Sequence, residues 1–171
     1  MKFDLLLSLG SNIEPRDFYL KKAIFLLNKS FEFVSNSSLY KTHPMYDTNQ
    51  DYFYNMCVFY KTENSDVFDI LSITKGIEDI IGRNKINDRP KGPRNIDIDI
   101  IFYSDLKINS DNLNIPHKGL FERNFVMMPL VEILPEYFQV AQNDILPIAD
   151  FQPAQLALLE KKEPYEASKP G

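Results

Sequence analysis

The 171-residue sequence predicts one α+β domain with a mainly antiparallel sheet. Short apolar runs of strand length alternate with two longer segments of helical periodicity, at residues 15–28 and 65–82. The segments follow the order β-α-β-β-α-β, and a shorter β/α appendix comes after them. A length of this size suits a single domain, which we expect to span residues 1–162, with 163–171 as a frayed tail.

The first half of the chain predicts a strand at 3–9, a helix at 15–28 and strands at 31–41 and 51–61. Pro15 suits the first turn of a helix, where its missing N–H costs nothing. Apolar side chains then recur at helical spacing at Leu20, Ala23, Ile24 and Leu27. Serine and asparagine in the middle of 31–41 predict a weak or bulged strand there.

The second half predicts a helix that Ser65 caps and Gly82 ends, then a buried strand within 92–103. Residues 106–115 suit one or two short strands with a turn at 109–111. Short helical pieces are expected at 119–125 and 129–134, and a last helix at 153–162. The first six elements match the ferredoxin-like, or split β-α-β, arrangement, in which the strand of 92–103 is the fourth.

The composition narrows the possible environments and partners. A net charge of −5 argues against broad binding to nucleic acid or anionic membranes. No apolar run reaches the roughly 20 residues of a membrane span, and the N-terminus lacks a signal-peptide layout. Cys57 is the single cysteine, which excludes an internal disulfide and suits a reducing, cytoplasmic compartment.

Two aspartates interrupt the apolar run of residues 92–103. Alternation along a strand places Ile96, Ile98 and Ile100 on one face and Asp97 and Asp99 on the other, roughly 7 Å apart. Two carboxylates at that spacing repel each other, and a hard cation such as Mg²⁺, which takes oxygen ligands, would offset the repulsion. The alternative is an amphipathic strand with a solvated face.

A basic cluster leads directly into this strand. Five cations face one acid, Asp88, between residues 82 and 94, and they are Arg83, Lys85, Arg89, Lys91 and Arg94. Cations beside a metal site are typical of a site for a polyphosphate with Mg²⁺, whereas a solvated charged loop is the alternative. Glu78 adds a weaker indication, because a carboxylate near a helix C-terminus opposes the helix dipole.

Asn55 lies within an apolar strand that is dense in aromatic residues. A buried amide needs partners, because leaving it unsatisfied costs about 1–3 kcal/mol. Those partners are either backbone groups or the polar edge of a flat heterocyclic ligand that nearby rings stack against. The Gly10-Ser11-Asn12 turn is similarly open, as a plain strand-to-helix turn or as backbone N–H groups near a ligand.

Six motifs occur together and in order. They are Leu9-Gly10-Ser11-Asn12, Tyr40-Lys41-Thr42-His43-Pro44, Phe53-Tyr54-Asn55, Ile77-Glu78 with Gly82-Arg83, Gly92-Pro93-Arg94-Asn95-Ile96-Asp97-Ile98-Asp99, and Ile115-Pro116-His117 with Arg123-Asn124-Phe125. Together they resemble the 6-hydroxymethyl-7,8-dihydropterin pyrophosphokinase family over roughly residues 3–135. The Gly-Pro-Arg-x-x-Asp-x-Asp block is highly specific, whereas Gly-Ser-Asn alone is weak.

The resemblance implies transfer of pyrophosphate from ATP to the hydroxymethyl group of the pterin, in folate biosynthesis, with two Mg²⁺ ions held by Asp97 and Asp99. It implies that the catalytic residues are Arg83, Arg94, Asp97 and Asp99. It implies that ATP is bound by Lys75, Glu78, Arg83, Lys85, Arg94, His117, Lys118 and Arg123. It implies that the pterin is bound by Thr42, Pro44, Met45, Phe53, Asn55 and Phe125.

The chain departs from the family pattern in three places. Lys91 stands where a loop tryptophan is usual, Asn112 and Asn114 stand where Arg and Thr are frequent, and Lys118 replaces an aromatic residue after His117. These changes concern affinity more than the type of reaction. Lys118 supplies a replacement positive charge.

The residues alone leave two other functions open. A polymerase-β-type nucleotidyltransferase also combines a Gly-Ser turn with an Asp-x-Asp strand, but in that class the two lie close together in sequence, unlike Ser11 and Asp97 here. A non-enzymatic ferredoxin-like binding module leaves the aspartate pair unexplained. We expect a monomer that binds small molecules.

Overall fold

A computed structural model describes residues 1–42, 51–82, 95–118, 129–130, 132–133 and 159–164. The elements are β1 (Phe3–Ser11), α1 (Arg16–Leu27), β2 (Glu32–Asn36), β3 (Ser38–Thr42), β4 (Phe53–Thr62), α2 (Val67–Ile81), β5 (Asp97–Tyr103), β6 (Ile108–Asn109), β7 (Asn114–Ile115) and β8 (Leu159–Pro164). The strand and helix order predicted for residues 3–103 is therefore confirmed, except that two strands, β2 and β3, replace the single one predicted at 31–41.

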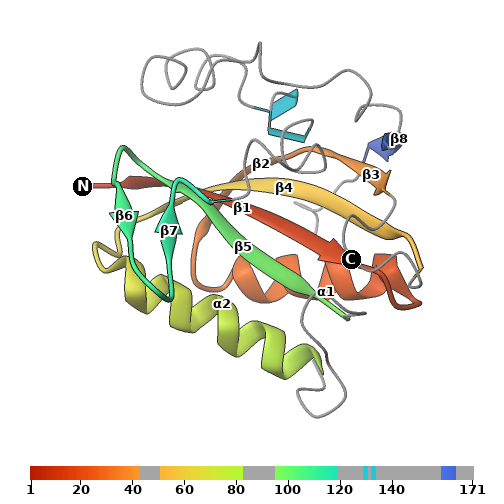
Figure 1. The fold of residues 1–171 in the computed structure, drawn as a ribbon, viewed down its shortest axis with the longest axis horizontal. Coiled ribbons are helices and arrows are strands. Elements are labelled where there is room, and N and C mark those ends of the chain that lie inside the picture. The colour runs from red at the N-terminus through yellow and green to blue at the C-terminus, as the bar shows by residue number, and fades with distance from the viewer. Residues whose placement is uncertain (43–50, 83–94, 119–128, 131, 134–158, 165–171) are drawn as a thin grey trace.

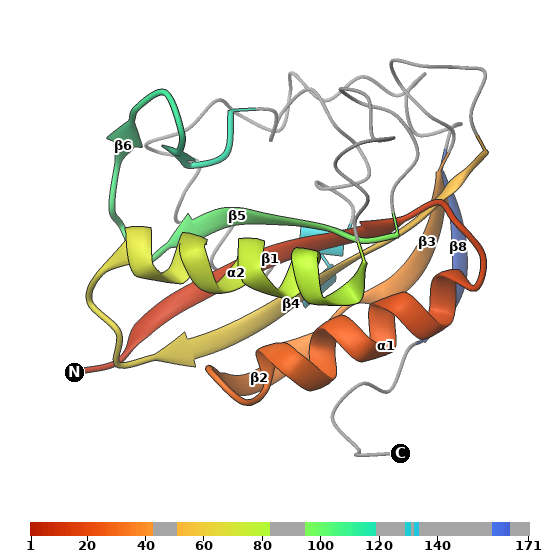
Figure 2. The ribbon, with the colours of Figure 1, turned by 90° about the horizontal axis from the view of Figure 1, so that it is seen from below.

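One six-stranded sheet organises the described residues. Its order is β5-β1-β4-β3-β8, with β2 also paired to β4, and each of these pairings is antiparallel. Helices α1 and α2 both pack against the same face of this sheet (Figure 1, Figure 2). This is the expected α+β, ferredoxin-like arrangement, with β4 at the centre, the aspartate strand β5 at one edge and β1 between them.

The core lies between the sheet and the two helices. Ile96, just before β5, and Ile98 and Ile100 of β5 are buried in this core, while Asp97 and Asp99 are half-buried on the opposite face. Alternate residues of β1, Leu5, Leu7 and Leu9, are fully buried and join the same core. The segregation of apolar and acidic side chains that alternation predicts is confirmed.

The ends of α2 show which capping residues act. The Asp66 side chain, not Ser65, caps the helix by accepting hydrogen bonds from the backbone N–H groups of Phe68 and Asp69. A carboxylate at this position also interacts favourably with the positive end of the helix dipole, which a serine hydroxyl does not match. Gly82 ends the helix with φ +102°, in the left-handed conformation that glycine adopts without strain, as predicted.

The strand predicted at 31–41 is divided by Ser37 into β2 and β3. The Ser37 backbone N–H donates to the Cys57 carbonyl, and the Ser37 hydroxyl accepts from the Cys57 N–H. Ser37 therefore takes over pairing that an unbroken ladder would provide, which agrees with the expected weak middle. The two short strands β6 and β7 form a separate antiparallel pair, also as expected.

The prediction of a helix at 153–162 is wrong for residues 159–162, because residues 159–164 form strand β8. Lys161 pairs with Tyr40 of β3, so β8 satisfies backbone groups that an edge strand would expose, and this tertiary pairing overrides the local helical pattern. Glu163 and Pro164, expected in the frayed tail, belong to β8. Residues 43–50 and 153–158 and the piece 119–125 lie outside the described residues, while Pro129, Leu130, Glu132 and Ile133 have helical backbone.

Neither of the two helices in the described part of the chain has the length and apolar character that a bilayer crossing requires.

Candidate functional site

Two rows of residues cross the sheet on the face away from the helices. In the first row, Gly10 of β1 lies between Asp97 of β5 and Asn55 of β4. In the second row, Ser8 lies between Asp99 and Cys57. Neighbouring strands are about 4.8 Å apart, so the aspartate strand and the asparagine strand are about 10 Å apart on this face. The residues expected to bind metal and pterin thus share one surface.

Gly10 makes room for the Asn55 side chain. A Cβ atom at Gly10 would lie 2.6 Å from Asn55 Oδ1 and 3.7 Å from a ring carbon of Phe53. The Asn55 amide therefore lies directly over the β1 backbone, and the side chain is buried, at 4% exposure. The sequence singled out Gly10 only as part of a turn, and its contact with Asn55 depends on strand register, which the sequence alone does not give.

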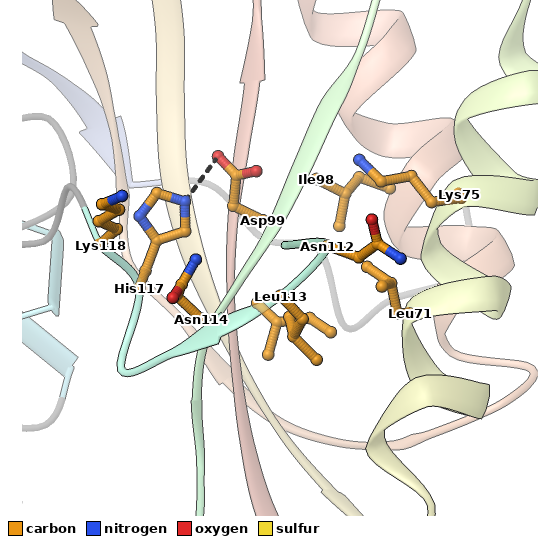
Figure 3. A pocket seen from close by; sticks show the side chains of 10 residues that line it. Leu71, Lys75, Ile98, Asp99, Asn112, Leu113, Asn114, His117 and Lys118 are labelled. Carbon is orange, nitrogen blue, oxygen red and sulfur yellow. Dashed lines mark ion pairs between the residues drawn. The ribbon is translucent and has the colours of Figure 1, made fainter. Parts of the chain in front are cut away.

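A cavity of about 140 Å³ opens at the β5 edge of the sheet, between α2, β5 and residues 112–118. In Figure 3 the His117 ring points toward the Asp99 carboxylate, whereas Lys75 reaches in from α2 on the other side of β5. The full lining is Leu71, Lys75, Ile98, Asp99, Ile100, Asn112, Leu113, Asn114, His117 and Lys118. One cavity therefore joins an expected metal ligand to three residues expected to bind ATP.

His117 is held against the aspartate strand by its own backbone. Its N–H donates to the Ile101 carbonyl at 3.0 Å, which fixes residues 115–118 along the edge of β5. From there the imidazole Nε2 lies 3.9 Å from Asp99 Oδ2, and both side chains are partly exposed. A proton on the imidazole makes this an ion pair, so a bound anion and Asp99 compete for the same ring.

Lys75 and Glu78 form an ion pair on α2 next to the cavity. Lys75 Nζ lies 3.1 Å from Glu78 Oε1, and the Glu78 side chain is only 1% exposed while Lys75 is half exposed. A buried carboxylate is unfavourable unless it is paired, and the partner ammonium supplies that pairing. Glu78 therefore holds Lys75 at the cavity wall, which gives a physical reason for an acid near the C-terminal end of α2.

Cys57 and Tyr40 lie on the same face as the aspartates but bring no charge to it. Burial raises the pKa of the Cys57 thiol, which is fully buried. Burial, and then a hydrogen bond from the Tyr40 hydroxyl to Glu132 (2.9 Å), raises the pKa of Tyr40. Both groups therefore stay protonated at neutral pH.

Two carboxylates on the open face of β5 are oxygen donors of the kind that Mg²⁺ takes. Among the described residues, no group of three or more His, Cys, Asp and Glu side chains is placed to hold a metal ion. Mg²⁺ is usually bound by one or two carboxylates together with water and substrate phosphates. Asp97 and Asp99, on alternate residues of β5, form a carboxylate pair that such a site could use.

The remaining expected site residues divide into two groups. Thr42 ends β3, where its backbone pairs with Phe53 of β4, next to the row that holds Asn55. Seven expected site residues lie outside the part of the chain that the structure describes, and they are Pro44, Met45, Arg83, Lys85, Arg94, Arg123 and Phe125. Lys91, the replacement for the usual tryptophan, lies outside it too.

A buried arginine near this surface was not singled out from the sequence. Arg16, the first residue of α1, is 2% exposed and contacts the residues that lead into β4. A cation in the first turn of a helix opposes the helix dipole, which is the same kind of signal that drew attention to Glu78. That signal was present in the sequence.

Comparisons with known proteins agree on one family. A family model described as 7,8-dihydro-6-hydroxymethylpterin-pyrophosphokinase (HPPK) matches residues 6–135. A 2-amino-4-hydroxy-6-hydroxymethyldihydropteridine pyrophosphokinase of Bacillus subtilis is 37% identical over 129 residues, which cover 74% of this chain and 75% of that protein. A bifunctional protein FolKE of Lactococcus lactis is 37% identical over 161 residues, which cover 92% of this chain and 45% of that protein.

Several relatives are much longer than this chain. The mitochondrial folate synthesis bifunctional protein of Pisum sativum is 39% identical over 132 residues, which cover 77% of this chain but 25% of the relative. The crystal structure of wild-type Plasmodium falciparum HPPK-DHPS with pteroate is similar with a TM-score of 0.66 and 20% identity, covering 80% of this chain and 39% of that one. The structural likeness supports the fold, and the chain spans less than half the length of these bifunctional relatives.

Proposed function

This chain belongs to the 7,8-dihydro-6-hydroxymethylpterin-pyrophosphokinase family, and on that basis we propose that it transfers pyrophosphate from ATP to 6-hydroxymethyl-7,8-dihydropterin in folate biosynthesis. The observation that carries the proposal is the shared surface of Asp97, Gly10 and Asn55, beside the cavity that contains Asp99 and His117. A carboxylate pair for a metal and an amide for a heterocycle lie one strand apart, as a two-substrate transfer requires.

The transfer exchanges one phosphorus–oxygen bond for another. The substrate hydroxyl oxygen bonds to the β-phosphorus of ATP, the bond from that phosphorus to the α-phosphate bridging oxygen breaks, and AMP leaves with both electrons. The hydroxyl proton passes to solvent. Because this chemistry depends on alignment and charge neutralisation, the protein mainly binds and orients the two substrates.

Asp97 and Asp99 would hold Mg²⁺, with two ions in our proposal. When bound, Mg²⁺ neutralises phosphate charge and lowers the pKa of an attacking hydroxyl. The two carboxylates lie on alternate residues of a strand whose other face is anchored in the core. That anchoring fixes their spacing, which is what a rigid metal-binding surface requires.

The nucleotide occupies the cavity at the β5 edge in this proposal. Lys75, held by Glu78, and the pair His117 and Lys118 approach it from opposite sides of β5. These groups neutralise phosphate charge or bind the nucleoside, and Glu78 contributes by placing Lys75. Four further cations stay predicted ATP ligands from the family resemblance, and they are Arg83, Lys85, Arg94 and Arg123.

The pterin occupies the surface over β1 and β4. Asn55, placed over Gly10, would hydrogen-bond the polar edge of the ring, and Phe53 would contact its face. Thr42, at the end of the adjacent strand, would border the same surface. Pro44, Met45 and Phe125 stay predicted pterin contacts.

Product analysis separates this proposal from the two alternatives. Purified protein is incubated with ATP and Mg²⁺, with and without 6-hydroxymethyl-7,8-dihydropterin, and nucleotides are separated by chromatography. AMP that forms only when the pterin is added supports the pyrophosphokinase. Release of inorganic pyrophosphate indicates a nucleotidyltransferase, and no turnover indicates a binding module. The monomeric state and the cytoplasmic location stay predictions that sedimentation and fractionation can test.

A further inference from the structure

Arg16 is a fully enclosed cation at the turn from β1 into α1. Its Nε donates to the Tyr52 carbonyl at 3.1 Å, Nη2 lies 3.5 Å from Asp51 Oδ2, and Nη1 pairs with Glu14. Only 2% of the side chain is exposed. Burying a guanidinium is unfavourable unless its donors are satisfied, so this arrangement depends on all of these partners.

Aromatic rings complete the surroundings of the guanidinium. Its carbon atom Cζ lies 3.8 Å from the Tyr52 ring centroid and 5.6 Å from the Tyr54 ring centroid. The centroids of the two tyrosine rings are themselves 5.6 Å apart. These distances are within the range of cation–π attraction. Lys41 of β3 adds a second cation, 4.5 Å from the Tyr52 ring centroid.

The position of this cluster along β4 links it to the proposed pterin surface. Tyr52 and Tyr54 alternate with Phe53 and Asn55, so the arginine contacts one side of the strand start while Phe53 and Asn55 lie on the other. Tyr54 packs against the core on the helix-covered face. Arg16 therefore holds the backbone of this segment from the helix-covered face, while Phe53 and Asn55 lie on the opposite face.

A second hydrogen bond joins the β1–α1 turn to the start of β4. The Asn12 side chain donates to the Asp51 carbonyl at 3.4 Å, and Asn12 is 3% exposed. The end of β1 and the start of α1 thus hold residues 51–54 at several points, at the end of the sheet where β1 leads into α1 (Figure 1). A rotation of this segment would move Asn55 relative to Gly10, where the contact is already tight.

We propose that Arg16 is a positioning residue for the pterin substrate: by stacking on Tyr52 and bonding its carbonyl, it sets the placement of Phe53 and Asn55. The inference rests on the proposed function, because it concerns the pterin surface of that reaction. Arg16 does not touch the substrate, since Tyr52 and the β4 backbone lie between them.

Two variants test the proposal. Arg16→Lys keeps the charge but loses the planar stack and the forked donors, and Tyr52→Leu removes the ring while leaving the arginine. The matched control is Lys29→Met, which removes a different cation–aromatic contact, with Phe25 at 4.7 Å, on an exposed part of the chain. KM is measured for each substrate, and pterin affinity is measured by calorimetry with a non-hydrolysable ATP analogue and Mg²⁺.

Both variants should raise the KM and the dissociation constant of the pterin about tenfold, because small misplacements of binding groups have effects of this order or larger. The KM of ATP and the control's constants should stay within about twofold, a factor too small to reflect a displaced binding group. Wild-type pterin affinity in both variants, even with a lower melting temperature, would assign Arg16 a purely structural role and overturn the proposal. An equal rise in both KM values would overturn it too. Absence of pterin-dependent AMP release by the wild type would instead refute the proposed function, and this inference with it.

Discussion

Gly10 and Asn55 lie opposite each other in β1 and β4, and the Asn55 amide oxygen occupies the space that a side chain at Gly10 would need. The distance of 2.6 Å from Asn55 Oδ1 to an added Cβ is shorter than real contacts allow. Since backbone pairing fixes both residues, the amide must move if Gly10 gains a methyl group. The glycine thus determines where the amide is presented.

The Gly10→Ala variant should therefore lose pterin affinity more than stability. We expect the KM of the pterin to rise at least tenfold, with the KM of ATP nearly unchanged, because displacing one hydrogen-bonding group is enough for a change of that size. Gly76→Ala is the matched control. A Cβ at Gly76 of α2 meets nothing within 4 Å, so this variant should keep wild-type kinetics and gain up to about 1 kcal/mol of stability. Equal pterin KM values in the two variants would contradict the assignment of Asn55 to pterin binding.

Asp97→Ala and Asp99→Ala should each abolish turnover while leaving the fold intact. Both side chains lie on the face away from the core, so their loss removes no core packing, but it removes the carboxylates proposed to hold Mg²⁺. Steady-state AMP release and circular dichroism measure the two effects. Asp105→Asn, an exposed carboxylate in the turn after β5, serves as the control and should keep full activity. Near-normal Mg²⁺-dependent activity in either alanine variant would exclude the metal role.

His117→Gln should weaken ATP binding. The imidazole lines the cavity and faces Asp99 at 3.9 Å, and its replacement removes a ring that can carry charge in the cavity proposed to bind ATP. We expect the KM of ATP to rise several-fold to about tenfold, as for loss of one charge-assisted hydrogen bond. Lys107→Met changes an exposed cation that does not line the cavity, and its KM should match the wild type. A pterin KM that rises instead would place His117 on the other substrate.

Cys57 should make the protein less stable at alkaline pH. Burial raises the pKa of its thiol above the ordinary value of 9.0, so above that pH the unfolded chain loses a proton that the folded chain keeps. The stabilisation is therefore fully present below pH 9 and is lost as the pH rises, by at most about 1.4 kcal/mol per pH unit for one group. Urea unfolding at pH 7, 8.5 and 10 measures it. Cys57→Ala should show a flatter decline between pH 8.5 and 10, and identical slopes would refute the role of the thiol.

Local patterns predicted those parts of the site whose geometry follows from one strand. The alternation of Ile96, Asp97, Ile98 and Asp99 was enough to place the isoleucines in the core and the carboxylates outside it, because a strand has only two faces. The place of this strand in the chain was also predictable, since the β-α-β-β-α-β order makes the aspartate strand the fourth strand of a ferredoxin-like domain. The acidic face therefore followed from the sequence, whereas the edge position of β5 came from the structure.

Contacts between strands and helices did not follow. The tight approach of Asn55 to Gly10 depends on a register of one residue, and the burial of Arg16 depends on where α1 begins relative to β4. Strand β8 was missed because its pairing partner, β3, is more than a hundred residues away, and periodicity within 153–162 carries no information about that edge. Each of these features is set by tertiary contacts that select one of several conformations compatible with the local sequence.

The start of α2 offers a direct test of how local patterns mislead. Ser65 and Asp66 are both good N-cap residues, but the Asp66 carboxylate accepts from the N–H groups of Phe68 and Asp69, at 3.0 and 3.3 Å. Asp66→Ala should therefore lower the free energy of unfolding by about 1 kcal/mol. Ser65→Ala, the neighbouring change at an exposed residue, should have less than about half of that effect.

Urea unfolding at neutral pH measures both variants, and Asp66→Asn completes the set because an asparagine side chain also caps. We expect Asp66→Asn to lie close to the wild type and well above Asp66→Ala. Since α2 carries Lys75 and Glu78 several turns away, AMP release should be unchanged in all three variants at temperatures where they stay folded. A larger loss of stability in Ser65→Ala than in Asp66→Ala would show that the serine hydroxyl, as first expected, begins the helix.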